Sequence, residues 1–300
     1  MAEATAGSGI RRRPVVAGVD GSEGALAAVG WAAAEAARRR LPLRLVAAHT
    51  WPAGGLVGDP GLGVDPRVVL RDMVLGHLAA AAATASAAAA GLAVEQVEVD
   101  GDPAAVLAGE SERAELVVLG DRGLGGFTGL LLGSVADALS ARAACPVVVV
   151  RGVETDPAVP RPEPVVVGVD GSPGSTAALA FAVEAAVLRS VPLVAVHAWR
   201  DVLVDTTMAP LVDWDAVESD EREVLAERLA GIRTTYPDLV VRRLVVRDRP
   251  ARALVDESRS AQLVVVGSRG RGGVQGLLLG SVSQQLLHHA HCPVAVVRPH

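Results

Sequence analysis

The chain contains no lysine and no asparagine, so its 28 basic residues other than histidine are all arginines. The absence of lysine excludes chemistry that depends on a lysine amine, including Schiff-base formation and the phosphate-loop motif Gly-x-x-x-x-Gly-Lys. Arginine remains suited to phosphate, because its planar guanidinium can donate two parallel hydrogen bonds to one anion. A phosphate ligand is therefore compatible with this composition, provided that no lysine is needed to hold it.

Aromatic residues make up only 2% of the chain, and the formal net charge is -6. A chain with no basic domain and few aromatic side chains to stack on bases lacks the usual features of a nucleic-acid-binding protein. We therefore expect no nucleic-acid partner.

Cysteines and long apolar runs are also scarce. Cys145 and Cys292 are the only cysteines, and each precedes a proline at a matching place in its half of the chain. We expect both to be reduced and buried, as in a cytoplasmic protein. The N-terminal arginines follow no apolar stretch, so no signal peptide is expected. The alanine-rich tract from Ala79 to Ala90 is too short and too weakly hydrophobic to span a bilayer, so we expect no membrane association.

What the chain has in abundance is internal repetition. VVAGVDGSEG from Val15 matches VVVGVDGSPG from Val165, and the separation between matching segments stays close to 150 residues. Three hundred residues are enough for two hydrophobic cores. We therefore predict two tandem domains, at 1–152 and 164–300. The Pro/Glu-rich stretch 153–163 is the predicted linker, because proline fixes the backbone and lacks a donor.

Within each half, short valine-rich runs alternate with long alanine- and leucine-rich segments. Near-continuous apolar runs are typical of parallel strands that are covered on both faces. The predicted strands of the first half are 15–19, 43–48, 94–99, 116–119 and 147–150, and the predicted helices include 24–40 and 68–90. The alternation predicts an α/β fold with a doubly wound, five-stranded parallel sheet in each half. Ligands of such sheets bind beyond the carboxyl ends of the strands, where the strand order reverses.

The last predicted strand of each half is a valine-rich run, at 147–150 and 294–297. Each run would be an unprotected sheet edge if it stayed unpaired. We therefore expect the two to pair with each other, which would make one chain a pseudo-dimer.

A glycine-rich motif follows the fourth predicted strand in both halves. LVVLGDRGLGGFTGLLLGSV begins at Leu116 and LVVVGSRGRGGVQGLLLGSV at Leu263, and both reduce to Gly-x-x-Gly, nine residues and Gly-Ser. Glycine lets the backbone approach an anion, and the N-terminus of the following helix favours phosphate. The motif is not the dinucleotide fingerprint, which follows the first strand. It predicts a phosphate site in each half; the alternative is that Ser134 and Ser281 are helix N-caps without a ligand.

An aspartate follows the first predicted strand of each half, Asp20 in GVDGSEG and Asp170 in GVDGSPG. A carboxylate at this edge can accept sugar hydroxyls or hold a divalent metal. The alternative is that it caps the next helix or stabilises the turn. We favour the ligand role. Two roles are also open for His49 and His197, which lie near the end of the second strand of each half. Each could polarise a nucleotide, or it could be buried with its hydrogen bonds satisfied.

Together these motifs resemble the universal stress protein family, in particular its tandem two-domain members in actinobacteria. The resemblance covers essentially all of both halves, and the glycine motif is typical of the ATP-binding branch. It implies a Rossmann-like fold of the adenine nucleotide alpha hydrolase type, with strand order 3-2-1-4-5. It also implies that ATP is bound as a regulatory signal with little or no turnover. Pairing through the last strand of each domain, and a homodimer of the chain, are further implications.

Carried onto this sequence, the family pattern implies two ATP sites, with Asp20 and Asp170 as candidate ligands of an accompanying Mg²⁺. The residues implied at the first site are Gly18, Asp20, Thr50, Gly120, Asp121, Arg122, Gly123, Gly125, Gly126, Gly133, Ser134 and Val135. The residues implied at the second site are Gly168, Asp170, Ala198, Gly267, Ser268, Arg269, Gly270, Arg271, Gly272, Gly273, Gly280, Ser281 and Val282.

The two glycine motifs agree in their glycines but differ in charge. The second copy has Ser268, Arg269 and Arg271 where the first has Asp121, Arg122 and Leu124. At these positions the second copy carries two positive charges, whereas the charges of the first cancel. A carboxylate that faces phosphate repels it unless a metal lies between them. We therefore predict that the second site binds ATP more tightly and that the first depends more on Mg²⁺.

Three functions compete for these motifs. The leading hypothesis is a non-catalytic ATP-binding protein whose nucleotide state tunes oligomer or partner contacts during stress adaptation. The main alternative is a slow ATPase or nucleotide hydrolase of the same fold. Against it, neither copy shows a nucleophile with an adjacent general base. The third is a scaffold in which the glycines only shape loops.

Overall fold

The structure is a computed structural model of the chain, and it describes residues 13–50, 66–123, 132–151, 163–199, 214–271 and 278–299. The elements of the first half are β1 (Val15–Gly18), α1 (Glu23–Arg39), β2 (Leu43–His49), α2 (Pro66–Ala88), β3 (Val94–Asp100), α3 (Pro103–Ser111), β4 (Leu116–Gly120), α4 (Ser134–Arg142) and β5 (Val147–Val150). The elements of the second half are β6 (Val165–Gly168), α5 (Pro173–Arg189), β7 (Leu193–Trp199), α6 (Trp214–Thr235), β8 (Val241–Arg247), α7 (Pro250–Glu257), the short 3-10 helix η2 (Ser258–Ser260), β9 (Leu263–Gly267), α8 (Ser281–His289) and β10 (Val294–Val297). The predicted linker lies outside the described residues, apart from Glu163.

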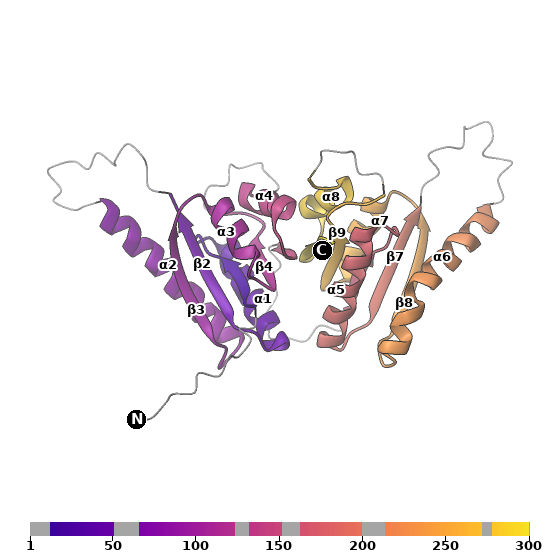
Figure 1. Cartoon of the computed structure of the whole chain (residues 1–300), viewed down its shortest axis with the longest axis horizontal. Helices are drawn as coiled ribbons and strands as arrows, with labels where there is room; N and C mark the ends of the chain where they lie inside the picture. The colour runs from indigo at the N-terminus through magenta and orange to yellow at the C-terminus, as the bar shows by residue number, and fades with distance from the viewer. Residues whose placement is uncertain are drawn as a thin grey trace, which may run out of the picture.

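The strands form one ten-stranded sheet in the order β3-β2-β1-β4-β5-β10-β9-β6-β7-β8. Within each half the strands are parallel and follow the order 3-2-1-4-5 that the family resemblance implied. The halves meet at β5 and β10, which run antiparallel with Val148 opposite Ala295. The prediction that the last strands pair with each other is therefore confirmed, and the two predicted sheets are joined into one. Figure 1 shows the two halves side by side, with α2 and α6 at the outer ends.

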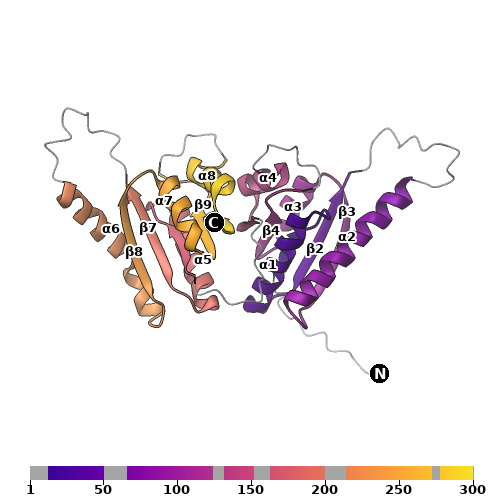
Figure 2. The ribbon, with the colours of Figure 1, turned by 180° about the vertical axis from the view of Figure 1, so that it is seen from behind.

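Helices cover both faces of the sheet, because successive strand residues point to opposite sides. Val15 and Ala17 pack in the core that includes α1 and α2, whereas Val16 packs with Leu107 of α3 and Leu139 of α4. The three strand residues are fully buried. This burial on both faces is the physical reason for the near-continuous valine runs. The view from behind shows the same arrangement of the two halves (Figure 2).

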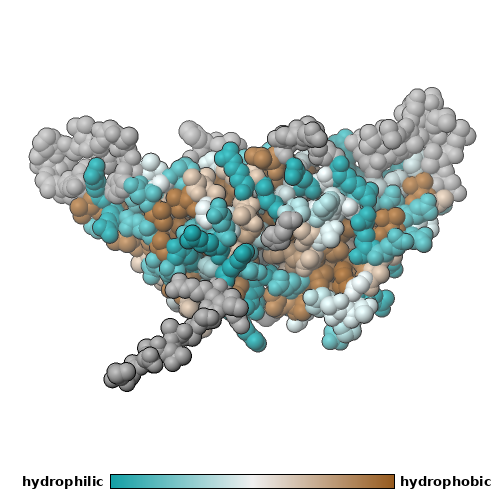
Figure 3. Space-filling view, viewed as in Figure 1, coloured by the Kyte–Doolittle hydropathy of each residue, from teal (hydrophilic) through white to brown (hydrophobic). Residues whose placement is uncertain are grey.

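Helix α2 is longer than the alanine-rich tract that it contains. By length and composition its segment Arg67–Ala88 could cross a membrane, and 22% of the apolar window is buried. The tract 79–90 thus belongs for the most part to a longer helix than its composition indicated, and the expected absence of membrane association stays a prediction. Its core-facing residues are Val74, Leu78, Ala81 and Ala85. On the face drawn in Figure 3, hydrophobic and hydrophilic groups are interleaved.

Both cysteines are buried and unpaired, as predicted. Burial raises the pKa of the Cys145 thiol and of the Cys292 thiol to about 12. Because the thiolate is the reactive form, neither thiol is a reactive nucleophile in the folded protein.

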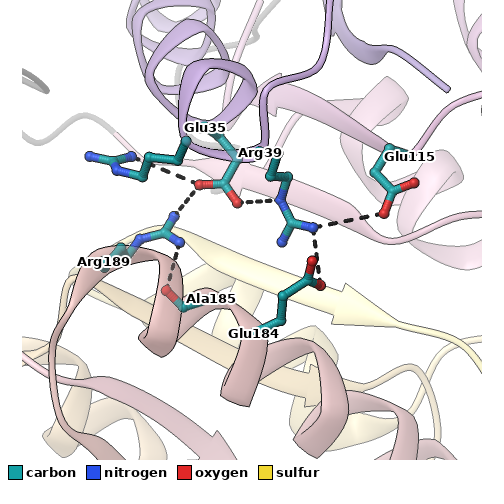
Figure 4. A network of polar contacts seen from close by, with 7 residues as sticks. Glu35, Arg39, Glu115, Glu184, Ala185 and Arg189 are labelled. Carbon is teal, nitrogen blue, oxygen red and sulfur yellow. Dashed lines mark hydrogen bonds and ion pairs between the residues drawn. The ribbon is translucent and has the colours of Figure 1, made fainter. Parts of the chain in front are cut away.

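Helices α1 and α5 meet across the boundary between the halves through a cluster of charged side chains (Figure 4). Glu35 is fully buried; its Oε1 accepts from Arg39 Nε at 2.6 Å, and its Oε2 accepts from Arg189 Nη2 at 2.6 Å. Arg39 also lies 3.1 Å from Glu184 of α5. Burial by itself raises the pKa of Glu35, but the attraction of Arg189, Arg39 and Arg38 outweighs it and holds this pKa below its ordinary value. Charge pairing therefore joins the halves in addition to strand pairing.

Two arginines just beyond the last strands bind the opposite half. Arg151 follows β5 and donates to the Leu287 carbonyl of α8 at 2.6 Å. Arg298 follows β10 and donates to the Ala141 carbonyl of α4. Both carbonyls lie in the last helical turn, where backbone acceptors have no partner within the helix. Each helix that follows a glycine motif is thus tied at its C-terminal end to the other half.

Candidate functional site

Two cavities lie beyond the carboxyl ends of the strands, one in each half. The first has a volume of about 470 Å³ and lies beside β1 and β4, and the second has a volume of about 410 Å³ and lies beside β6 and β9. Both volumes fall in the range of roughly 300–1,000 Å³ that is usual for small-molecule sites. Each cavity occupies the point of reversed strand order where the sequence predicts a ligand.

Part of each cavity is apolar. The apolar lining of the first includes Val46, Ala48, Leu107, Leu119 and Leu132. The apolar lining of the second includes Val196, Ala198, Leu254, Val266 and Leu279. Such a surface suits a flat ring system better than a sugar or a phosphate.

The rest of each cavity is polar or lined by glycine. The predicted residues that line the first cavity are Gly18, Asp20, Gly120, Arg122, Gly123, Gly133, Ser134 and Val135. Those that line the second are Gly168, Asp170, Ala198, Gly267, Arg269, Gly270, Arg271, Gly280, Ser281 and Val282. Helices α4 and α8 begin at these residues, so each cavity adjoins the positive end of a helix dipole.

The glycines also have a packing reason that is independent of any ligand. A Cβ built on Gly120 would overlap the backbone of Gly24 near the start of α1. A Cβ built on Gly123 would overlap Asp20 Oδ2, and the second half repeats both relations. The motif therefore lets the fourth strand, the first turn and the first helix of each half approach closely.

Asp20 and Asp170 hold the turn after the first strand of each half. Asp170 Oδ1 accepts from Ser172 N at 2.9 Å and from Ser172 Oγ at 2.6 Å, and its Oδ2 accepts from Arg271 N at 3.0 Å. Asp20 Oδ1 accepts from Ser22 N at 3.0 Å and Ser22 Oγ at 2.6 Å. Burial raises the pKa of Asp170, but the hydrogen bonds outweigh burial and hold this pKa below its ordinary value. Each carboxylate thus stabilises a turn and also lines a cavity.

Ser134 and Ser281 are not the N-caps of their helices. The N-cap positions are occupied by Gly133 and Gly280, both with extended backbone. Each serine is instead the first helical residue, exposed and at the cavity wall. The alternative that these serines serve only as caps is therefore wrong.

One implied residue of the first site, Thr50, does not line the first cavity. Ala48 lies there instead, and Ala198 lines the second cavity as predicted. The reason is the strand register, since Ala48 rather than Thr50 corresponds to Ala198. Gly18 of the first half pairs with Val46, and its counterpart Gly168 pairs with Val196. Val46 therefore corresponds to Val196, and Ala48, two residues later, corresponds to Ala198.

The same register shows that His49 and His197 are not structural counterparts. His197 is buried, with Nδ1 2.6 Å from the Val169 carbonyl oxygen and Nε2 2.7 Å from Glu221 Oε2. His49 Nε2 lies 3.0 Å from Glu98 Oε1. Neither histidine lines either of these two cavities, which supports hydrogen-bonded roles, with His197 buried and His49 half-buried.

Asp121 lies outside the first cavity despite its place in the glycine motif. Its side chain is buried, and its backbone N–H donates to the Val150 carbonyl at 2.9 Å. Burial lowers the pKa of nearby Arg151, and the charge of Asp121 opposes this shift. Asp121 therefore does not line the cavity directly, and the weaker ATP binding and greater Mg²⁺ dependence of the first site stay predictions. Ser268 of the second copy is likewise buried and outside the cavity.

Four implied glycines, Gly125, Gly126, Gly272 and Gly273, lie outside the described residues. Within the part of the chain that the structure describes, no three His, Cys, Asp or Glu side chains gather into a group that could hold a metal.

Sequence reasoning missed the contribution of α3 and α7. Pro103 and Leu107 line the first cavity, and Pro250 and Leu254 line the second. A signal was present, because PAAVL and PARAL recur at matching places after the third strand of each half. The repeat places the same proline and leucine against each cavity.

The sequence profile described as "Universal stress protein family" matches residues 11–151 and 162–298. The chain belongs to the universal stress protein family. A universal stress protein of Mycobacterium tuberculosis is 43% identical over 298 residues, which cover 96% of this chain and 98% of that protein. One from Mycolicibacterium smegmatis is 39% identical over 290 residues, which cover 95% of this chain and 97% of that protein.

Among solved structures, a universal stress protein from Archaeoglobus fulgidus has the same fold. Its TM-score is 0.68 at 20% sequence identity, and the match covers 97% of this chain and 100% of that chain. The matches thus cover nearly the full length of these relatives as well as of the present chain.

Proposed function

We propose that this universal stress protein binds an adenine nucleotide, and ATP in particular, in each of its two cavities. The observation that carries the proposal is the division of each cavity into an apolar part and a polar part at a helix N-terminus. A nucleotide has the same division between its base and its phosphates. The glycine- and arginine-lined end suits phosphate, and the leucine- and valine-lined part suits the adenine ring.

In this proposal ATP is a signal that the protein holds, with little or no turnover. The carboxylates at the cavities, Asp20 and Asp170, are hydrogen bonded within their turns, which supports holding rather than proton transfer. Helices α4 and α8 begin at the cavities and end at contacts with the other half through Arg298 and Arg151. Nucleotide occupancy at one end of each helix can therefore influence contacts at the other end.

Magnesium would enter these sites with the nucleotide. Each aspartate at a cavity has Oδ1 engaged by a serine, and Asp170 Oδ2 also accepts the Arg271 N–H. A carboxylate held in this way supplies at most one ligand oxygen. Phosphate and water oxygens would therefore provide most of the coordination, as is usual for Mg²⁺.

The pairing of β5 with β10 bears on the predicted homodimer. This pairing uses the edges of both last strands within one chain. A second copy would therefore have to bind through another surface. We keep the homodimer and a cytoplasmic location as proposals.

Mass spectrometry of nucleotide released from the denatured, purified protein tests the proposal. We expect adenine nucleotide in the supernatant, or saturable ATP binding if the nucleotide is lost during purification. If no nucleotide is released and the protein does not bind ATP, the scaffold alternative is favoured. Steady-state phosphate release, with Asp170→Ala as the control, tests the ATPase alternative, because sustained release that depends on Asp170 would contradict a holding role.

A further inference from the structure

Two arginines converge on one turn at the mouth of the second cavity. Gly171 has a φ of +79°, and a Cβ built on it would overlap the Nη2 atoms of both Arg228 and Arg271. The two guanidinium groups therefore lie against the same turn and close to each other. Asp170 and Ser172, on either side of Gly171, line the cavity, as does Arg271.

Arg228 reaches this turn from α6 and has no carboxylate to pair with on its own helix. The residues three and four positions away are all uncharged, namely Val224, Leu225, Gly231 and Ile232. Arg222, on the same helix, has Glu218 four residues before it and forms an ion pair with it at 2.5 Å. Among the described residues, neither Arg228 nor Arg271 forms a side-chain ion pair.

The carboxylate of the turn forms no hydrogen bond or ion pair with either guanidinium of this arginine pair. Asp170 accepts hydrogen bonds from Ser172 and from the backbone N–H of Arg271, rather than from either guanidinium. Two like charges held close together repel each other, and a multivalent anion between them removes the repulsion. Guanidinium groups offer several donors in a plane, which matches the oxygens of a phosphate chain.

The first cavity has a different group at the corresponding turn. Gly21 has a φ of +89°, and a Cβ built on it would overlap the imidazole ring of His77, which lies on α2. The sequence has Leu124 in the place of Arg271, although this residue lies outside the described part of the chain. One imidazole thus stands where the second half has two guanidiniums.

We propose that Arg228 and Arg271 form a phosphate-chain clamp that makes the second site select nucleoside triphosphates over monophosphates. The first site, with His77 at the same turn, discriminates less between them. The inference rests on the proposed nucleotide-binding function and adds the phosphate preference of each site.

The test measures the affinity of the second site for ATP and for AMP in full-length protein. Gly123→Ala is expected to abolish binding at the first site, because its Cβ would overlap Asp20 Oδ2 and displace this carboxylate. In this background we expect ATP to bind at least roughly tenfold more tightly than AMP, since charge-assisted hydrogen bonds are the strong ones. Arg228→Gln should weaken ATP binding by roughly threefold to tenfold and leave AMP binding within about twofold.

Arg222→Gln is the matched control. It removes the same charge from the same exposed helix, but from an arginine that pairs with Glu218. ATP binding should be unchanged in this control. Equal effects of Arg228→Gln on ATP and AMP, or an effect no larger than that of Arg222→Gln, would overturn the clamp.

Competition by tripolyphosphate, and the comparison of ATP with AMP, distinguish failure of the clamp from failure of the proposed function. Inorganic tripolyphosphate should compete with ATP at the second site and compete less well after Arg228→Gln. If tripolyphosphate binds as tightly as ATP, the clamp serves free polyphosphate and the nucleotide selection is wrong. If a folded protein binds neither ATP nor AMP, the proposed function fails. If both bind but without an Arg228-dependent preference, the clamp alone fails.

A gain-of-function variant does not depend on Gly123→Ala. His77→Arg places a guanidinium near the first turn, so it should raise the ATP preference of the first site in protein whose second site is closed by Gly270→Ala. An unchanged ratio of ATP to AMP affinity in this variant would count against the clamp.

Discussion

Arg189 Nη2 lies 2.6 Å from Glu35 Oε2, so a carboxylate of the first half and a guanidinium of the second meet inside the protein. The arginines that flank Glu35 also make reciprocal contacts. Arg39 lies over the ring of Phe181 at 5.1 Å from its centroid, and Arg189 lies over the ring of Trp31 at 5.5 Å. Glu35 is therefore the fully buried carboxylate of a boundary to which each half contributes an arginine and an aromatic ring.

Glu35→Gln should destabilise the protein by about 3–5 kcal/mol, because it removes one partner of a buried pair and leaves the buried Arg189 without its counter-charge. Urea denaturation followed by circular dichroism measures the change. Arg222→Gln, at an exposed pair, is the control and should cost about 0–1 kcal/mol. Equal losses in the two variants would show that the cluster does not hold the halves together.

The stability contributed by Glu35 should depend on pH in a defined direction. Its pKa is lowered in the folded protein, so the contribution is fully present above the unfolded value of about 4.3 and is lost as the pH falls through the folded value. The difference in Tm between the protein and Glu35→Gln should therefore be large at neutral pH and shrink on acidification. A difference that stays constant down to strongly acidic pH would contradict the lowered pKa.

Substitution of glycine by alanine should lower stability where the glycine is closely packed and raise it where the surrounding space is open. Gly120→Ala should destabilise by about 1–3 kcal/mol, because the added Cβ would overlap the backbone of Gly24, which cannot rotate away. Gly76→Ala on α2 meets no atom within 4 Å and should stabilise by up to about 1 kcal/mol through helix propensity. The urea midpoints of the two variants should move in opposite directions. Movement in the same direction would contradict the packing reason for the motif.

The two thiols should resist alkylation in the folded protein. Burial raises the pKa of Cys145 and of Cys292 to about 12, so almost no thiolate is present near neutral pH. Mass spectrometry after iodoacetamide treatment at pH 8 should show no adduct without urea and two adducts with it. Rapid labelling of the native protein would argue against the burial of these residues.

Much of the fold was predictable because the duplication repeats every strong signal. Valine runs located the strands of both halves, and unprotected edges predicted that 147–150 would pair with 294–297. The glycines and aspartates of the cavities were predictable because each is needed for close approach or for a turn. Their roles toward a nucleotide stay predictions.

The errors in the candidate site have physical causes. Aligning the two histidines placed Thr50 at the first cavity, whereas the strand register places Ala48 there. A sequence motif also cannot tell which way Asp121 points, and its carboxylate is buried near Arg151 instead of facing the cavity. The approach of Arg228 to Gly171 depends on how α6 packs, which no local pattern encodes.

The stoichiometry of ATP binding, measured by equilibrium dialysis, tests directly whether both cavities are nucleotide sites. We expect two ATP molecules per unmodified chain, one in Gly123→Ala, one in Gly270→Ala and none in the double variant, because each added Cβ would overlap the aspartate at its cavity. All four proteins should retain the same circular dichroism spectrum. Absence of ATP binding to the unmodified protein, or an unchanged stoichiometry in the folded double variant, would contradict the assignment of these cavities as nucleotide sites.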